Sequence, residues 1–208
     1  MPQANAKHRR AKAERWSPED RRRQLIGIGF RLIAERGIDA LRTRDIAAAA
    51  KINIATFHYH FPTKEALLRA VVADLIDQFR SATPAKQDPA QSALQLLRLE
   101  MQDVRTRLVS AQQQLTVLTE LAIRARRDPA MAQILRRMDN GWHGQLTEIL
   151  QRGKKNGEFR QDLDPSIAAS VIMAQLRSLG FLVDPKQAVV LRIFDQIEAQ
   201  IETWLMPR

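Results

Sequence analysis

Residues 43–65, TRDIAAAAKINIATFHYHFPTKE, limit the possible folds more than any other part of the chain. They predict two short helices separated by about three residues, which is helix-turn-helix spacing. Thr43 can cap the first helix and Asn53 can cap the second, expected over roughly 54–60. In such a unit the second helix presents its N-terminal end and one face to the DNA major groove.

The cluster FHYHF within this segment divides between two sides of the second helix. Phe57 and Phe61 are four residues apart, so both should pack inward. The side chains left nearer the outer surface are Thr56, His58, Tyr59 and His60. Because the two histidines are two positions apart on a helix, they point in different directions and cannot chelate one metal ion well. The cluster therefore predicts a packed inner side and a contacting outer side.

The rest of the chain reads as helical, since Ala, Leu, Gln, Glu and Arg are plentiful and β-branched alternation is scarce. Ser17-Pro18 marks the start of the first long helix, and Gly37 is expected to end it. Thr63 should cap a later helix. A helix break is expected near residues 108–110, and Lys154–Gly157 is a helix stop. Four Asp-Pro pairs mark further helix starts: 88–89, 128–129, 164–165 and 184–185. The total is about nine helices in an all-α fold.

The positive charge is concentrated at the beginning of the chain. Residues 1–64 hold 14 Lys and Arg against 6 Asp and Glu, whereas residues 65–208 hold 19 against 17. A basic unit joined to a nearly neutral remainder suggests that only the first part faces a polyanion. Cysteine is absent, which excludes disulfides and thiolate chemistry. No apolar run reaches the ~18 residues that span a bilayer, and the N-terminus has no signal-peptide pattern, so we expect a cytoplasmic protein without membrane contact.

The segment around the two short helices resembles the N-terminal DNA-binding domain of TetR/AcrR-type transcriptional regulators. Their pattern has a glycine at the end of the first helix, followed by Thr-x-x-Ile-Ala-x-x-Ala-Gly-Val-Ser-x-Gly-x-Leu-Tyr-x-His-Phe-x-x-Lys-Glu-x-Leu. The matching residues here are Gly37, Thr43, Ile46, Ala47, Ala50, His60, Phe61, Lys64, Glu65 and Leu67. The resemblance covers roughly residues 18–70. This chain departs from the pattern at Lys51 and Ala55, which replace glycines, at Asn53, which replaces a serine, and at His58, which replaces a tyrosine.

The resemblance implies a set of DNA-binding residues. Thr43, His58, Tyr59 and Lys64 would contact phosphates, and Asn53, Ile54, Ala55 and Thr56 would face base edges. Arg44 and His60 complete the predicted DNA-binding set. The basic arm at residues 1–16 either reaches along the DNA backbone or into the minor groove, or is a solvated, disordered tail, and the sequence favours neither alternative.

We expect three parts: a basic arm (1–16), a helix-turn-helix domain (17–62) and a helical effector-binding and dimerisation domain (63–208). The last two helices each carry a wide apolar stripe that suits a four-helix bundle with a second subunit. The residues predicted at this dimer interface are Ile167, Val171, Ser178, Val190, Phe194, Ile197 and Ile201. The alternative is that both stripes face the chain's own core.

The effector pocket is predicted among the central helices. Its candidate lining residues are Met101, Gln114, Leu118, Trp142, His143, Met173, Arg177 and Phe181. Each of these side chains could equally be ordinary core. Arg177 could bind an anionic ligand or pair with an acid such as Asp139 or Glu120.

Two functions remain open at this stage. The first is a homodimeric repressor that binds a palindromic DNA operator and is released by a small-molecule effector. The alternative is a constitutive architectural or partner-recruiting DNA-binding factor without a ligand. An enzyme is not expected, because the sequence contains no catalytic constellation or phosphate-cradling loop, and no cofactor or metal is predicted. The residues do not identify the effector, the operator or the direction of regulation.

Overall fold

The computed structural model describes residues 16–81, 91–182 and 186–207. Within these ranges the chain forms nine α-helices and one short 3-10 helix, η1, so the all-α prediction is confirmed. Residues 1–15 of the predicted arm and the Asp-Pro pairs at 88–89 and 184–185 lie outside the described residues. The elements are α1 (Pro18–Ala40), α2 (Thr43–Ala49), α3 (Ile54–His60), α4 (Lys64–Ser81), α5 (Ala93–Ser110), α6 (Gln112–Ala125), α7 (Pro129–Lys155), α8 (Pro165–Ser178), η1 (Leu179–Phe181) and α9 (Gln187–Leu205).

Most predicted helix starts are confirmed by the hydrogen bonds of their caps. The Ser17 hydroxyl accepts from the Asp20 N–H at 3.0 Å, and the Asn53 side chain accepts from the Thr56 N–H at 2.7 Å. Asp128 and Asp164 each accept two N–H groups of the first turn of their helices. These bonds satisfy N–H groups that have no partner inside a helix.

One predicted helix cap was wrong, and one predicted helix end is followed by a further short turn. Arg42, without a side-chain bond, occupies the cap position of α2, and Thr43 is the first helical residue. Gly37 has φ 75° and ψ 166°, so the regular part of α1 stops there as predicted, and a separate short turn continues from this kink to Ala40. Glycine tolerates this left-handed φ because it has no Cβ, so the chain changes direction without losing the last turn. The expected break between α5 and α6 is confirmed at Ala111.

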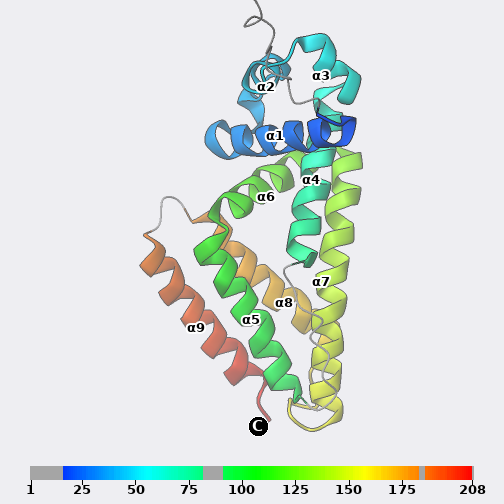
Figure 1. Ribbon diagram of the computed structural model, residues 1–208. Coiled ribbons are helices and arrows are strands. Elements are labelled where there is room, and N and C mark those ends of the chain that lie inside the picture. Colours follow the sequence, from blue (N-terminus) through cyan, green and yellow to red (C-terminus); the bar gives the residue numbers. More distant parts are fainter. Residues whose placement is uncertain (1–15, 82–90, 183–185, 208) are drawn as a thin grey trace, which may run out of the picture.

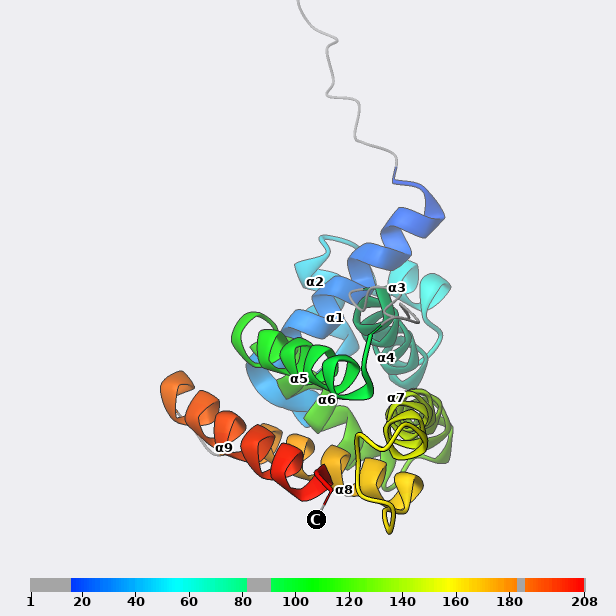
Figure 2. The same cartoon turned by 90° about the horizontal axis from the view of Figure 1, so that it is seen from below.

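Figure 1 shows how the helices are arranged in space. α1, α2 and α3 lie together at one end of the molecule, and α6 runs beneath α1. α4 and the long helix α7 lead from that end towards the other helices. Seen from below, α8 and α9 form one side of the domain that contains α5 and α7 (Figure 2). None of the helices in the described ranges is long and apolar enough to cross a membrane.

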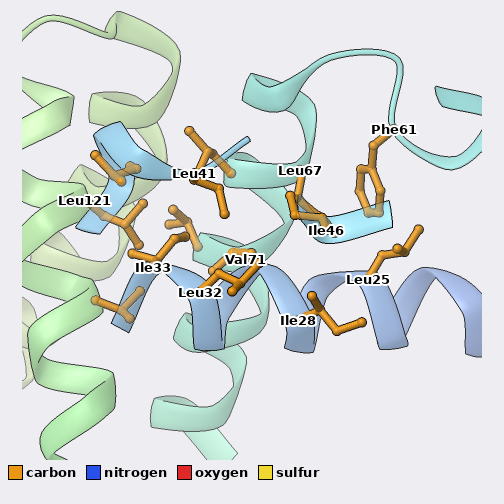
Figure 3. Packing of buried hydrophobic residues seen from close by; sticks show 14 of the residues in the cluster. Leu25, Ile28, Leu32, Ile33, Leu41, Ile46, Phe61, Leu67, Val71 and Leu121 are labelled. Atoms are coloured by element: carbon orange, nitrogen blue, oxygen red, sulfur yellow. The ribbon is translucent and has the colours of Figure 1, made fainter. Parts of the chain in front are cut away.

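The buried side chains form two clusters. The first joins α1–α4 to two later helices, because Val117 and Leu121 of α6 and Met131 and Leu135 of α7 belong to it. Figure 3 shows Leu121 near the end of α1 in this cluster. The second cluster fills the space among α5, α7, α8 and α9. The core of the helix-turn-helix part therefore does not close at residue 62.

One close packing contact fixes the C-terminal end of α7. Phe159 is fully buried and lies against Gly153, the position at which a methyl group would approach the ring to 2.1 Å. Lys154 and Lys155 end the helix, and Gly157 follows with φ 73°, as the stop signal predicts.

Candidate DNA-binding surface and effector cavity

The aromatic cluster of α3 divides as the sequence predicts. Phe57 and Phe61 are fully buried, with ring centroids 6.1 Å apart. Tyr59, between them in sequence, is 78% exposed. Arg22 of α1 lies over the Phe61 ring at 4.3 Å and donates to the His60 carbonyl at 3.1 Å. The inner side of α3 is therefore fixed by its two phenylalanines and by Arg22, while its outer side remains accessible.

The predicted base-reading residues lie at the exposed beginning of α3. Asn53, Ile54 and Ala55 are exposed, and Thr56 is partly buried. The Asn53 side-chain oxygen accepts from both the N–H and the hydroxyl of Thr56, the latter at 2.8 Å. The tight turn before them places Lys51 at φ 55°, a left-handed conformation that costs a non-glycine residue free energy.

The predicted phosphate-binding residues do not share one environment. Arg44 is exposed in the first turn of α2, and Thr43 beside it is partly buried. His58 is exposed, and its Nδ1 lies 3.1 Å from the Pro62 carbonyl. Burial, together with the nearby charges of two arginines of α1, lowers the pKa of His60 and so favours its neutral form.

Lys64 differs from the others because its ammonium group already has a protein partner. Its Nζ donates to the carbonyl oxygen of Ile38 at 2.8 Å, joining the start of α4 to the end of α1. Burial and then the neighbouring Arg124 guanidinium lower the pKa of Lys64 from its usual value. The adjacent N–H of Ile38 donates to the Glu120 carboxylate of α6 at 3.3 Å. This role of Glu120 could not be predicted from the sequence, because no local pattern reports a contact 82 residues away.

A cavity of about 1440 Å³ lies among α4, α5, α6, α7, α8 and η1. Of the predicted lining residues, Leu118, Trp142, Arg177 and Phe181 do line it. Arg177 donates to Asp139 at 2.6 Å, which is one of the two pairings considered from the sequence, and its guanidinium lies 5.8 Å from the centre of the Trp142 ring. Burial raises the pKa of Asp139, and the charge of Arg177 opposes that rise.

The other four predicted pocket residues do not line the cavity. Met101 of α5 and Met173 of α8 are buried in the second core cluster and do not line the cavity. His143 bonds to the Ser166 carbonyl and the Ser170 hydroxyl, which ties α7 to α8. Gln114 does not line the cavity either.

One carboxylate of the cavity wall was not among the predicted residues. Glu100 is 6% exposed and accepts from the Gln145 side chain at 2.6 Å. Its spacing from Leu96 and Leu97 places it on the inner stripe of α5, and a charged residue at such a position was the available signal.

The predicted dimer residues separate into two groups. On α8, Ile167 is 61% exposed, and Val171 and Ser178 are also exposed. Phe194 and Ile201 of α9 are instead buried in the chain's own core, so their placement at the interface was wrong. Val190 and Ile197, also on α9, are only partly buried. The apolar face of α9 is therefore wide enough to serve the core with one side and leave the other partly accessible.

Comparison with known proteins identifies the family. Residues 25–71 match the family model of bacterial regulatory proteins of the tetR family, and residues 97–196 match a tetracyclin repressor-like C-terminal domain. The HTH-type transcriptional repressor KstR2 of Rhodococcus jostii (strain RHA1) is 30% identical over 164 residues, which cover 71% of this chain and 72% of that protein. The chain belongs to the TetR family. The resemblance seen in the sequence is thereby confirmed.

Two further proteins are similar over most of the chain. The HTH-type nicotine-responsive transcriptional repressor HdnoR of Paenarthrobacter nicotinovorans is 25% identical over 171 residues, which cover 82% of this chain and 88% of that protein. The solved structure of AibR in complex with isovaleryl coenzyme A and operator DNA has the same fold, with a TM-score of 0.70 and 20% identity. That match covers 89% of this chain and 98% of AibR. TetR regulators are DNA-binding proteins and generally not enzymes.

Proposed function

We propose that this TetR-family protein is a transcriptional repressor that binds a palindromic operator as a homodimer and is released by a small-molecule effector. The division of α3 carries the proposal. Its phenylalanines fix the helix to the core, and its opposite side, with Tyr59 78% exposed, can enter a DNA groove. Asn53, Ile54, Ala55 and Thr56 would face bases, while Thr43, Arg44, His58 and Tyr59 would contact phosphates and His60 would border this surface.

The exposed side of α8 supports dimerisation. Ile167 and Val171 are large apolar side chains in contact with solvent on the same helix face, and Ser178 continues that face. A second copy covering them would exclude water from this surface, with the partly buried Val190 and Ile197 of α9 beside it. A two-fold dimer places two α3 helices about 34 Å apart, one turn of DNA, which requires a palindromic site.

The cavity supports control by an effector. Its volume, about 1440 Å³, accommodates a small molecule, and its walls combine apolar side chains with a few polar groups such as Gln145 and Arg177. Relatives point the same way, since one is named a nicotine-responsive repressor and another was solved with isovaleryl coenzyme A and operator DNA. Four residues of α6 line the cavity, and the same helix enters the core of the DNA-binding end. A ligand that moves α6 would weaken DNA binding, and DNA would weaken ligand binding equally.

We also propose that the protein acts in the cytoplasm and without catalysis, as a DNA-binding regulator would. The alternative, a constitutive DNA-binding factor, keeps α3 and the dimer but leaves the cavity without a role. A thermal-shift screen of small molecules separates the two functions. A compound that raises the melting temperature and also releases DNA supports the repressor, whereas compounds that bind without changing DNA affinity support the constitutive factor.

The DNA-binding proposal is tested by selecting bound duplexes from a random pool. We expect a palindromic consensus whose half-sites are one helical turn apart. Arg44→Gln removes an exposed cation near α3, and Lys155→Gln, the matched control, removes one at the far end of α7. The first variant should weaken binding of the selected duplex and the second should not. Equal binding of every duplex by the wild-type protein would contradict the proposal.

A further inference from the structure

The backbone of Ile38 is held from two sides by charged groups of two different helices. Its carbonyl accepts from the Lys64 ammonium at 2.8 Å, and its N–H donates to the Glu120 carboxylate at 3.3 Å. Both bonds involve an ionised side chain and a polar backbone group, which makes them stronger than bonds between neutral groups. We call this arrangement of Lys64, Glu120 and the Ile38 backbone the Ile38 clamp.

The clamp lies where α1 is interrupted. Gly37 has φ 75° and ψ 166°, so the helix is not continuous at this point. Ile38 itself is 5% exposed, and buried backbone groups require partners. The Glu120 carboxylate lies 3.6 Å from the position of an added Cβ on Gly37, so it packs directly over the break. The last turn of α1 is therefore oriented by side chains from outside the helix.

Both helices that supply the clamp also form the cavity. α4 begins at Lys64 and contributes Ala73 and Ile76 to the cavity wall. α6 contributes Thr119, the residue immediately before Glu120. The clamp thus connects two walls of the cavity with the end of α1, and the chain passes from there into α2 after only two residues.

We propose that Lys64 is a positioning residue that acts with Glu120 to orient the end of α1, and that it is not a phosphate ligand. This inference rests on the proposed function, because it concerns operator binding. It assigns Lys64 a role different from the one that the family resemblance implies. Loss of the clamp changes the placement of α2 and α3, and so lowers operator affinity without removing a charge–phosphate contact.

The salt dependence of operator binding distinguishes these two roles. The binding constant for DNA falls as the salt concentration rises. Removing a phosphate contact makes this dependence shallower, by about one unit of the slope of log K against log salt per protomer. We expect Arg44→Gln to show this decrease. Lys64→Met should instead lower affinity on the order of tenfold with an unchanged slope, because a bond between a charged and a neutral group is lost inside the protein. A slope reduced to the same extent as in Arg44→Gln would overturn the proposal.

Conservative replacements separate positioning from general stability. Glu120→Gln keeps an oxygen that accepts from Ile38, whereas Glu120→Ala does not, so the glutamine variant should retain most of the operator affinity that the alanine variant loses. Lys64→Arg keeps a donor and should likewise retain affinity. Lys64→Met and Glu120→Ala together should cost less than the product of their separate fold-changes, because both act on one peptide.

Glu120→Gln and Glu120→Ala test the proposal without Lys64→Met, should that variant not fold. Equal affinity in Glu120→Ala and wild type would contradict the clamp. Absence of specific binding by the wild-type protein would instead refute the proposed function, so the two failures have different signatures.

Discussion

Replacing Phe57 and Tyr59 separately by alanine should affect different properties: the first change should lower stability, and the second should lower DNA affinity at nearly unchanged stability. Phe57 is fully buried, and a buried Phe→Ala change costs about 3–5 kcal/mol of unfolding free energy, because it removes apolar contacts and leaves a cavity. For a chain of this length each kcal/mol lowers the melting temperature by about 2–4 °C, so Phe57→Ala should lower it by about 6–20 °C.

Tyr59 is the matched control within the same helix. With 78% of its surface exposed, it contributes little to the core, and Tyr59→Ala should change stability by about 0.5 kcal/mol or less. Its proposed phosphate contact would be lost, so operator affinity should fall by several-fold although the fold is intact.

Two assays on each variant test this reasoning. Circular dichroism during heating reports the melting temperature, and retardation of the selected operator duplex reports affinity at a temperature where both variants are folded. A Tyr59→Ala variant that melts at as low a temperature as Phe57→Ala, or that keeps the operator affinity of the wild type, would contradict the division of α3 into a buried and a DNA-contacting side.

Three further changes have defined outcomes. Burial and neighbouring positive charge lower the pKa of His60 in the folded protein, so the unfolded chain takes up the proton at a higher pH than the folded one. Stability should therefore fall as the pH drops from 6.5, the ordinary pKa of histidine, through the lowered pKa of the folded state. His60→Gln should show less of this loss in denaturation measured at several pH values. Ile167→Glu places a charge on the proposed dimer face and should shift the protein towards monomer in sedimentation, with little change in helix content by circular dichroism; an unchanged dimer would place the interface elsewhere. Gly153→Ala requires the Phe159 ring to move, since a methyl group would approach it to 2.1 Å, and should cost about 1–3 kcal/mol or more in chemical denaturation.

Much of the helical framework could be predicted because helix ends depend on local chemistry. Ser17, Asn53, Asp128 and Asp164 accept N–H groups that lie within three residues of them, so their pattern is visible in the sequence. The family pattern likewise placed α3, whose two buried phenylalanines follow from a spacing of four residues. Gly37 shows the limit of such signals, because the glycine marks a change of direction but does not reveal that one more helical turn follows.

The cavity and the interface were harder to predict because they depend on what lies opposite each side chain. Met101 and Met173 carry the same local signal as Leu118, yet only Leu118 faces a space that the neighbouring helices leave open. Phe194 belongs to the same apolar stripe as Ile197, but the first is fully buried in the second core cluster and the second is only partly buried. Periodicity identifies an apolar face and does not say whether one or two neighbours share it.

The placement of α6 in the first core cluster limits how this regulator can be re-engineered. A chimera that grafts residues 17–62 onto a foreign effector domain would deprive Ile33 and Leu41 of the contacts that Leu121 and its neighbours supply. Those apolar surfaces would face water and favour aggregation of the hybrid. A DNA-binding unit transferred from this chain must therefore include α4 and a helix that replaces α6. Only then does the hybrid protein keep the apolar packing beneath α1 along with the operator specificity of α3.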